Sequence, residues 1–487
     1  MAPGYAIDAL LFVAVVGALA CLVAQPRPVL AMAIAVSAVE LGLAASLWVA
    51  VLAKGPATAE DELFFVDAFS AFHLVVLGLV FLLCSLFARI YFADDGEHGL
   101  TKSAARRFGA LWLGSLAAMV LVLVSNNLGV MWVGMEATTL LTAFLISLHP
   151  NRLSLEAMWK YLLICSVGIA FAFIGTIFAA ASVQGGLGAD ALLWTRLAAP
   201  ETQFDPTLMT FAFVFVLVGY GTKAGLAPIH SWLPDAHSQA PAPVSAMFSG
   251  FLLNTALYCI LRYVPLVRHA LGNGFADHLL VFFGTLSILV AAGFIVFQRD
   301  AKRLLAYHSV EHLGIIALGY GLGPLGTFAA LFHTLNHSIC KALAFFAVGR
   351  LGQRFGSHDM HVLSGAVRLT PLWGFALLVS ILALIGVAPF SIFMSEYQLL
   401  RAAVGAGAWL VLTLFLFASS VVFISALRHL IDMSFGDPKG ALPFRDGTGA
   451  IAAVAVSTGL LLLLGLWMPS WFVVALGRAA AAVGGRL

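Results

Sequence analysis

Charged residues are scarce in this sequence. Only 10% of the 487 residues are Asp, Glu, Lys or Arg, whereas 62% are hydrophobic, and the mean hydropathy is +1.01. Soluble domains carry about a quarter charged residues, so the composition excludes an ordinary soluble protein and predicts an all-α polytopic membrane protein. The net charge of +2 at pH 7 provides no basic surface, so we expect no nucleic acid as a partner.

Motifs that bind cofactors are also missing. The five cysteines occur singly within apolar runs, and no CxxC pair is present, which argues against an iron–sulfur cluster or structural zinc on this chain. The sequence has no GxxxxGK[ST], so ATP does not drive this chain directly. The glycines of "GYGLGPLG" follow no strand, and "HSWLPDAH" lacks a nucleophile elbow, so dinucleotide binding and hydrolysis are both disfavoured.

Apolar runs long enough to cross a membrane recur through the whole sequence. Short polar breaks such as "HPNRLSLE" and "FQRDAKR" separate them, and no stretch is typical of a soluble domain. A span needs about 20 residues, and on this basis we predict about fourteen helices in a single transmembrane domain, residues 1–487. Alternate breaks carry the arginines and lysines, so the positive-inside rule places the N-terminus outside. We expect a multi-pass plasma (inner) membrane protein surrounded by lipid bilayer.

Two proline-containing stretches resemble each other. "GLAPIHSW" at 225–232 and "GVAPFSIF" at 386–393 share Gly-x-Ala-Pro, with Lys223 before the first copy and Glu396 after the second. Proline interrupts a helix, and interrupted spans in corresponding halves of a chain indicate a transport site, with Glu396 as the counterpart of Lys223. A single match of this length can also arise by chance. The prolines that we expect at the breaks are Pro228, Pro234 and Pro389.

Many ionisable residues lie within or beside the apolar runs. Such a group at mid-bilayer costs roughly 2.5–3.5 kcal/mol, so each is a functional candidate that needs a partner or water. A buried lysine beside a movable carboxylate can bind and release a proton, and Glu136 is the natural partner for Lys223. A static ion pair between helices is the alternative. The candidates for proton transfer are Glu136, Lys223, His230, Asp235, His237, His308, Glu311, His312, His333, His337, Lys341 and Glu396.

Three of these candidates share one face of a predicted helix. His333, His337 and Lys341 recur every fourth residue, and histidine titrates near neutral pH, so a proton relay is the favoured interpretation. A packed histidine face is the second interpretation. Metal binding is the weakest, because no carboxylate or thiolate on that face completes a ligand set, and we expect no metal site. Prolines and charges together then indicate a hydrated path inside the bundle.

Three stretches carry a resemblance to a known family. "GTKAGLAPIHSWLPDAHSQAPAPVSAMFSG" resembles the signature of the antiporter-like subunits of respiratory complex I, Mrp antiporters and membrane-bound nickel–iron hydrogenases. "KRLLAYHSVEHLGIIALG" and "HTLNHSICKALAFFAVG" are similar to later helices of this family and most resemble its hydrogenase-4 component F branch. The resemblance implies two inverted five-helix repeats, 108–265 and 278–430, each with a broken helix.

The same resemblance implies roles for individual residues. Glu136 would be the acidic residue of the fifth helix, Lys223 the lysine of the broken seventh helix, and Glu396 the charge of the broken twelfth helix. Asn254 departs from the pattern, because several relatives carry a lysine on that helix, and Lys341 is the candidate to replace it. The residues that would form the central relay are His333, His337 and Lys341.

We therefore expect a proton-translocating membrane subunit of a redox-driven complex, of the hydrogenase-4 or complex I kind, that moves protons along a buried Glu/Lys/His axis. It would be a non-catalytic subunit with no redox centre of its own. The resemblance implies nickel–iron, iron–sulfur or quinone on partner subunits, namely other membrane subunits and a peripheral redox arm. Two alternatives stay open: an Mrp-like sodium/proton antiporter subunit, and a membrane scaffold that has lost transport, which Asn254 favours.

Overall fold

The computed structural model describes residues 3–93, 99–437 and 446–484, and about four-fifths of the residues are helical. The long helices are α1 (Pro3–Val23), α2 (Pro26–Lys54), α3 (Ala68–Tyr91), α4 (Lys102–Val124), α5 (Leu128–Ile146), α6 (Arg152–Ala181), α8 (Pro206–Ala224), α11 (Leu253–Leu271), α12 (Phe275–Ile295), α13 (Ala301–Gly321), α14 (Gly323–Phe355), α18 (Trp409–Phe435) and α19 (Thr448–Leu466). The shorter ones are η1 (Gly188–Leu192), α7 (Trp194–Leu197), α9 (Trp232–Gln239), α10 (Ala242–Met247), η2 (Phe248–Leu252), α15 (Ala366–Leu369), α16 (Pro371–Leu384), α17 (Ser391–Gly405) and α20 (Ser470–Ala482).

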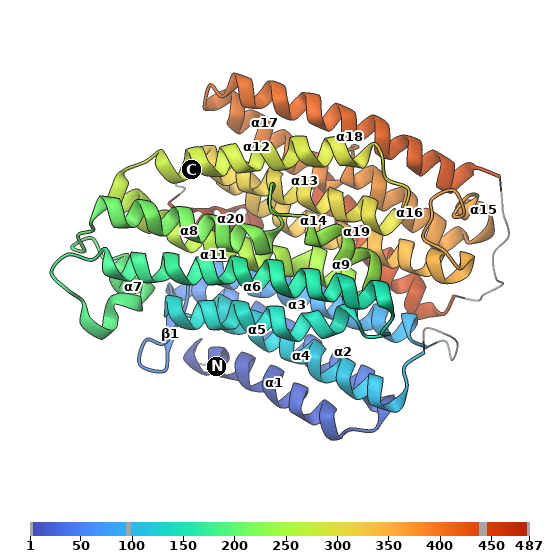
Figure 1. Ribbon diagram of the computed structural model, residues 1–487, viewed down its shortest axis with the longest axis horizontal. Coiled ribbons are helices and arrows are strands. Elements are labelled where there is room, and N and C mark those ends of the chain that lie inside the picture. Colours follow the sequence, from blue (N-terminus) through green and yellow to red (C-terminus); the bar gives the residue numbers. More distant parts are fainter. Residues whose placement is uncertain (1–2, 94–98, 438–445, 485–487) are drawn as a thin grey trace.

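The architecture confirms an all-α polytopic membrane protein. Within the described ranges, eleven helical segments are long and apolar enough to cross a membrane. Together with α13, α14 and the broken helix formed by α16 and α17, they agree with the predicted number of about fourteen. Figure 1 shows these helices side by side, with the N-terminal helices α1 to α4 on one flank, α16 to α18 on the other, and α13 and α14 between them.

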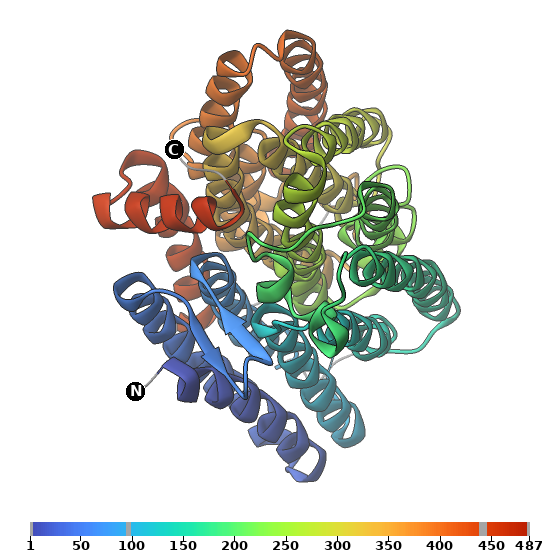
Figure 2. The ribbon, with the colours of Figure 1, turned by 90° about the vertical axis from the view of Figure 1, so that its left-hand side faces the viewer.

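The two ends of the bundle differ. One end carries the antiparallel hairpin of β1 (Ala57–Ala59) and β2 (Phe64–Val66) together with α7, and Figure 2 looks onto it. The other end carries α15 and basic residues at helix ends, among them Arg89 of α3, Lys102 of α4, Arg152 of α6 and Arg299 just before α13. Following the positive-inside rule, we call the end with the hairpin the outer end and the other the inner end.

Small residues let neighbouring helices approach closely. A Cβ placed on Gly219 of α8 would lie 2.4 Å from the backbone nitrogen of Ala172, and one on Gly175 of α6 would lie 2.7 Å from the carbonyl oxygen of Ala212. Lipid provides no hydrophobic force between helices, so close backbone packing of this kind holds a membrane bundle together. Close packing of α6 against α8 therefore fixes the position of the residues at the end of α8.

Both predicted breaks are present, at equivalent backbone positions. Gly225 follows α8 with φ +78°, and Gly386 follows α16 with φ +70°, a conformation that glycine adopts without steric cost. In each break, the amide after the glycine donates to the carbonyl five residues earlier, at 2.9 and 3.0 Å. Pro228 and Pro389 lie in the connections that follow, each after a cis peptide bond. The short sequence match therefore reflects two similar local structures.

The structure corrects two details of the sequence-based expectation. Pro234 lies in the first turn of α9, where its missing N–H costs no helical hydrogen bond, and not in the break itself. Glu396 is the positional counterpart of Asp235, because each follows the glycine of its break by ten residues. Lys223 precedes its break, so the two halves carry their buried charges on opposite sides of similar turns.

The span formed by α10, η2 and α11 lies at the centre of the bundle. Residues 242–264 of this span are all buried, whereas the most apolar stretch of α18 is only 22% buried. The π-helical segment η2 interrupts the α-helical hydrogen bonding of this span, and such segments are frequent at functional sites. Its neighbours include α3, α8 and α14, so this span joins the two flanks of the molecule.

Candidate functional site

Lys223 is held by neutral oxygen atoms in the bundle interior. Its side chain is fully buried in the last turn of α8, and Nζ donates to Thr139 Oγ1 at 2.7 Å and to the Tyr161 hydroxyl at 2.5 Å. Nζ also lies 4.7 Å from the centre of the Tyr161 ring, and Thr142 shares a hydrogen bond with the same hydroxyl at 2.7 Å. Helices α5 and α6 therefore provide the whole described environment of this amine.

Glu136 lies one turn from this site but does not contact it. Its Oε1 accepts a hydrogen bond from Ser166 Oγ at 2.8 Å, and its Oε2 has no hydrogen-bond partner among the described residues. Within that part of the chain, no ion pair joins Glu136 to Lys223, which was their expected relationship. Thr139 lies between them on α5, so a shift of either side chain by a few ångströms would be needed to pair the charges.

Four histidines meet at the centre of the bundle, on α13 and α14. His312 Nδ1 lies 2.8 Å from His333 Nε2, and the His312 ring lies 5.1 Å from both the His333 and His337 rings. His308 stands at the other side of His312, with ring centres 6.3 Å apart, and its Nδ1 lies 2.9 Å from Glu311 Oε2. The sequence predicted one histidine face on α14, and the structure extends it to a cluster on two helices.

Lys341 is the third position of the α14 face and lies next to this cluster. It is fully buried, and Nζ donates to the carbonyl oxygen of Leu305 on α13 at 2.5 Å. Neither ring nitrogen of His337, one turn away, has a hydrogen-bond partner among the described residues. An ammonium bound to a single carbonyl beside an unpartnered imidazole can exchange a proton through one intervening water.

Glu396 enters the cluster from α17. His333 Nδ1 lies 2.9 Å from the hydroxyl of Ser395, the residue before it. The Glu396 carboxylate folds back onto the second break, because a Cβ built on Gly386 would lie 2.4 Å from Glu396 Oε2. The break and the acid are therefore one structural unit.

The histidine cluster also has the composition of a metal-ligand set. His312, His333 and Glu396 offer ligand atoms within 4.8 Å of one another, as do His308, Glu311 and His312. The sequence argument against a metal considered only the α14 face and did not foresee carboxylates from α13 and α17. The direct bond between His312 and His333 is the feature that favours proton exchange, because a metal would have to separate these two nitrogens.

The three candidates around α9 lie apart from this cluster. His230, in the first break, packs near the rings of Phe294 and Tyr307, and His237 stacks on Phe345 with ring centres 5.0 Å apart. Asp235 lies at the inner end and is partly exposed. It pairs with Lys160 at 3.1 Å and Arg303 at 2.5 Å, on the wall of a cavity of about 260 Å³. We therefore assign Asp235 to the inner surface.

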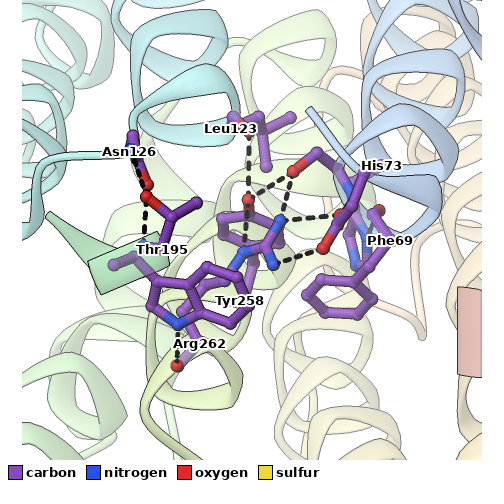
Figure 3. Close-up of polar contacts among 10 residues, drawn as sticks. Phe69, His73, Leu123, Asn126, Thr195, Tyr258 and Arg262 are labelled. Carbon is purple, nitrogen blue, oxygen red and sulfur yellow. Dashed lines mark hydrogen bonds and ion pairs between the residues drawn. The ribbon is translucent and has the colours of Figure 1, made fainter. Parts of the chain in front are cut away.

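Sequence reasoning missed a second buried charge site, shown in Figure 3. Arg262 of α11 forms a bidentate ion pair with Asp67, at 2.7 and 2.8 Å, and both side chains are less than a tenth exposed. Asp67 caps α3 by accepting from Ser70 N at 2.8 Å. Both residues lie near the ends of apolar runs, and the sequence analysis singled out neither. The available signal was the spacing of Asn254, Tyr258 and Arg262, at every fourth residue.

Two further buried ionisable groups were also missed. Lys302 donates to the carbonyl oxygens of Ser238 and Ala240, at 3.0 and 2.5 Å, and so neutralises the end of α9. Glu40 of α2 is 2% exposed, and its Oε1 has no hydrogen-bond partner among the described residues. Neither residue contacts the histidine cluster through a hydrogen bond or ion pair in the described part of the chain.

The arrangement is suited to moving protons. A buried amine, a run of imidazoles and a buried carboxylate lie in a bundle whose low dielectric strengthens each electrostatic contact. Groups of this kind are expensive to place in a membrane, and they mark ion paths and proton relays. The site offers neither a nucleophile elbow nor a phosphate-binding loop in the sequence.

Comparisons with known proteins identify the family of this chain. Residues 125–422 match the family described as NADH:quinone oxidoreductase/Mrp antiporter, TM. The hydrogenase-4 component F homolog of Methylacidiphilum infernorum (isolate V4) is 39% identical over 388 residues, which cover 77% of this chain and 80% of the relative. NADH-quinone oxidoreductase subunit 14 of Thermus thermophilus is 32% identical, over 82% of this chain and 86% of the relative.

A solved structure extends the similarity to almost the whole fold. A chain of the Mrp complex from Dietzia sp. DQ12-45-1b is 25% identical and superposes with a TM-score of 0.85, over 98% of this chain and 97% of that chain. These matches confirm the resemblance found in the sequence. The chain belongs to the NADH:quinone oxidoreductase/Mrp antiporter transmembrane family.

Proposed function

We propose that this chain is a proton-translocating membrane subunit of a redox-driven complex, of the hydrogenase-4 or complex I kind. The observation that carries the proposal is the linked run from Glu311 and His308 through His312 and His333 to Ser395, with Glu396 in reach. It is costly to bury a run of titratable groups from three helices inside a membrane bundle, and proton transfer gives a reason for that cost.

Lys223 is the proposed carrier in the first half of the chain. Its amine is held by two hydroxyls and no carboxylate, so movement of Glu136 towards it would change how firmly it holds its proton. His337 and Lys341 would pass protons between this site and the histidine cluster. We place the two repeats at 108–265 and 278–430, so that each contains one of the two similar breaks.

The energy for transport must come from outside the chain. Moving one charge against 100 mV requires about 2.3 kcal/mol, and the sequence has no nucleotide-binding loop. We propose that other membrane subunits and a peripheral arm carry the redox chemistry on nickel–iron, iron–sulfur or quinone groups. The named relatives from bacterial hydrogenase-4 and quinone oxidoreductase support this assignment and a place in the plasma (inner) membrane.

The test is driven proton uptake by the purified complex in liposomes. Lys223→Ala and Glu136→Gln should each abolish it, because each removes one member of the proposed carrier pair. Lys102→Ala is the matched control, since Lys102 is an exposed lysine at the inner end. Unchanged uptake in Lys223→Ala would refute the proposal.

A second candidate is an Mrp-like sodium/proton antiporter subunit. The similarity to the Mrp complex chain over 98% of the residues supports it. Sodium-dependent proton movement by preparations free of nickel and iron–sulfur subunits would favour this function. Co-purification with those subunits and no response to sodium would favour the first.

A further inference from the structure

A row of polar residues connects the centre of the bundle to its outer end, between α3 and α11. We call it the α3–α11 row, and its members are Asp67, Ser70 and His73 at and after the start of α3 and Asn254, Tyr258 and Arg262 on α11. Figure 3 shows the outer part of the row, around His73, Tyr258 and Arg262. Members on each helix are three or four residues apart, so they share one face. The two helices are antiparallel, so the row has matched levels from Arg262 and Asp67 outside to Asn254 inside.

The outer levels of the row are continuously hydrogen-bonded. Arg262 holds Asp67 in the bidentate pair and also donates to Ser70 Oγ. Arg262 Nε donates to the Tyr258 hydroxyl at 2.9 Å, and this hydroxyl lies 2.8 Å from Ser70 Oγ and donates to the carbonyl oxygen of Leu123 at 3.0 Å. Two hydroxyls, a carboxylate and a guanidinium therefore share one network.

The next level inward contains a titratable side chain. His73 is 2% exposed, and its Nδ1 shares a hydrogen bond with the carbonyl of Phe69 at 2.8 Å. Its ring lies 5.2 Å from the ring of Tyr258 and 6.2 Å from that of Phe251. The mechanism proposed above gives this buried histidine no role.

The inner end of the row meets the central cluster. Asn254 Nδ2 and Ser338 Oγ both donate to the carbonyl oxygen of Gly250, at 3.1 and 2.6 Å. Ser338 follows His337 directly on α14. Asn254 Oδ1 is buried and has no hydrogen-bond partner among the described residues, so an acceptor is available at this junction.

The outer end of the row lies beneath a cavity. The Arg262 guanidinium lies 4.8 Å from the ring of Trp194, whose Nε1 donates to the Arg262 carbonyl at 2.7 Å. The next residue, Thr195, lines an open cavity of about 530 Å³ together with Glu62 and Arg196. The Trp194 ring therefore lies between Arg262 and the cavity wall, where it stacks on the ring of Phe65 with ring centres 5.7 Å apart.

We propose that the α3–α11 row is the outer half of the proton path and that the Arg262–Asp67 pair is its gate. The inference rests on the proposed function. A clamped guanidinium in a low-dielectric passage repels an approaching proton, as fixed arginines do in other selective pores. A buried ion pair adds little net stability over apolar side chains, so stability alone gives no reason for charges here.

A proton taken up by His73 crosses to the Tyr258 hydroxyl through a water molecule, because the two rings are in contact but no hydrogen bond joins their side chains in the described part of the chain. It then passes through the hydroxyls of Tyr258 and Ser70, each of which receives one proton and releases its own, and it ends on a carboxylate oxygen of Asp67. Neutralising Asp67 weakens its hold on Arg262, whose guanidinium moves against the Trp194 ring. The proton then leaves Asp67 for water in the outer cavity, and the ion pair forms again.

The first experiment measures passive proton leak in liposomes that contain the purified complex without redox substrate. The double variant Asp67→Asn/Arg262→Gln removes the charged barrier and leaves no uncompensated charge. Water from the outer cavity then reaches the Ser70 and Tyr258 hydroxyls and replaces Asp67 as the acceptor, so leak should rise at least about tenfold. The control is Arg268→Gln/Asp277→Asn, which removes another outer ion pair, 2.7 Å long and outside the row. It should stay as tight as wild type. A double variant that assembles and does not leak overturns the gate.

The second experiment leaves the ion pair in place. His73→Phe preserves the aromatic packing and removes the carrier, so driven uptake should fall about tenfold while passive leak stays at the wild-type level. Wild-type uptake by His73→Phe overturns the path. Lys223→Ala separates this inference from the proposed function. If Lys223→Ala stops uptake while the His73 and gate variants behave as wild type, only the outer path is wrong. If Lys223→Ala transports protons normally, the proposed function fails.

Discussion

The Tyr161 hydroxyl accepts a hydrogen bond from Lys223 Nζ at 2.5 Å, so α6 fixes the position of the cation at the end of α8. Thr139 accepts the second bond, and both acceptors are neutral. Among the described residues, no carboxylate is bonded to the amine, so Lys223 breaks no ion pair when it approaches Glu136. Helices α5 and α6 therefore determine the position of Lys223. Helix α6 packs against α8, and α5 contacts α9, which follows α8 after the break.

Tyr161→Phe should lower driven proton uptake about tenfold, which corresponds to about 1.4 kcal/mol, because Lys223 loses one of its two acceptors. Uptake is measured in liposomes with an enclosed pH-sensitive dye. Tyr263→Phe is the matched control. The Tyr263 hydroxyl, like that of Tyr161, shares a hydrogen bond with a threonine, Thr176 at 2.8 Å, but it does not contact Lys223. Equal effects of the two variants would show that the loss is a general packing effect.

His312→Asn should reduce driven uptake by about a hundredfold or more, because His312 lies between His308 and His333, next to the first ring and hydrogen-bonded to the second. The redox rate of the complex, measured separately, tells whether transport and chemistry come apart. His278→Asn, at an exposed position of α12, is the control. Full transport by His312→Asn would rule out the cluster as an obligatory relay.

Gly386→Ala should impair transport while the complex still assembles. The new methyl group would lie 2.4 Å from the present position of Glu396 Oε2, so the carboxylate would have to move. A residue other than glycine at this left-handed backbone position also costs about 1–2 kcal/mol. Gly356→Ala, with φ +68° and no heavy atom within 4 Å of the new Cβ, has the same backbone cost alone. If both variants lose transport equally, displacement of Glu396 is not the cause.

Arg262→Gln should destabilise the protein by about 3–5 kcal/mol, because it leaves Asp67 buried without its partner. The double variant Asp67→Asn/Arg262→Gln should recover a large part of that loss. Thermal unfolding of the purified chain in detergent, followed by circular dichroism, gives both values. Additive losses in the double variant would mean that the two side chains are not energetically coupled.

The sequence predicted the fold class and the residues of the central cluster well, because both depend on local patterns. Apolar length predicts spans, and the spacing of His333, His337 and Lys341 predicts a helix face. The sequence could not predict that Glu396 and His312 join this face, because that contact depends on how α13 and α17 pack on α14. For the same reason Lys223 and Glu136 were expected in contact, although Thr139 and Tyr161 provide the acceptors.

The Asp67–Arg262 pair shows a second limit. Its members are separated by most of the first half of the chain, and each lies near the end of its apolar run. Interfacial charges are common in membrane proteins, so position in the run gave no reason to single them out. Their partnership becomes visible only when α3 and α11 are placed side by side.

The π-helical segment Phe248–Leu252 sets which way the outer half of its span faces. A π turn contains one residue more than an α turn, and each residue of an α-helix advances the side chains by about 100°. Deleting one residue from this segment would therefore rotate Tyr258 and Arg262 away from α3, although every side chain of the α3–α11 row would remain. The direction in which this helix presents its polar groups thus depends on the length of one turn that carries no charge.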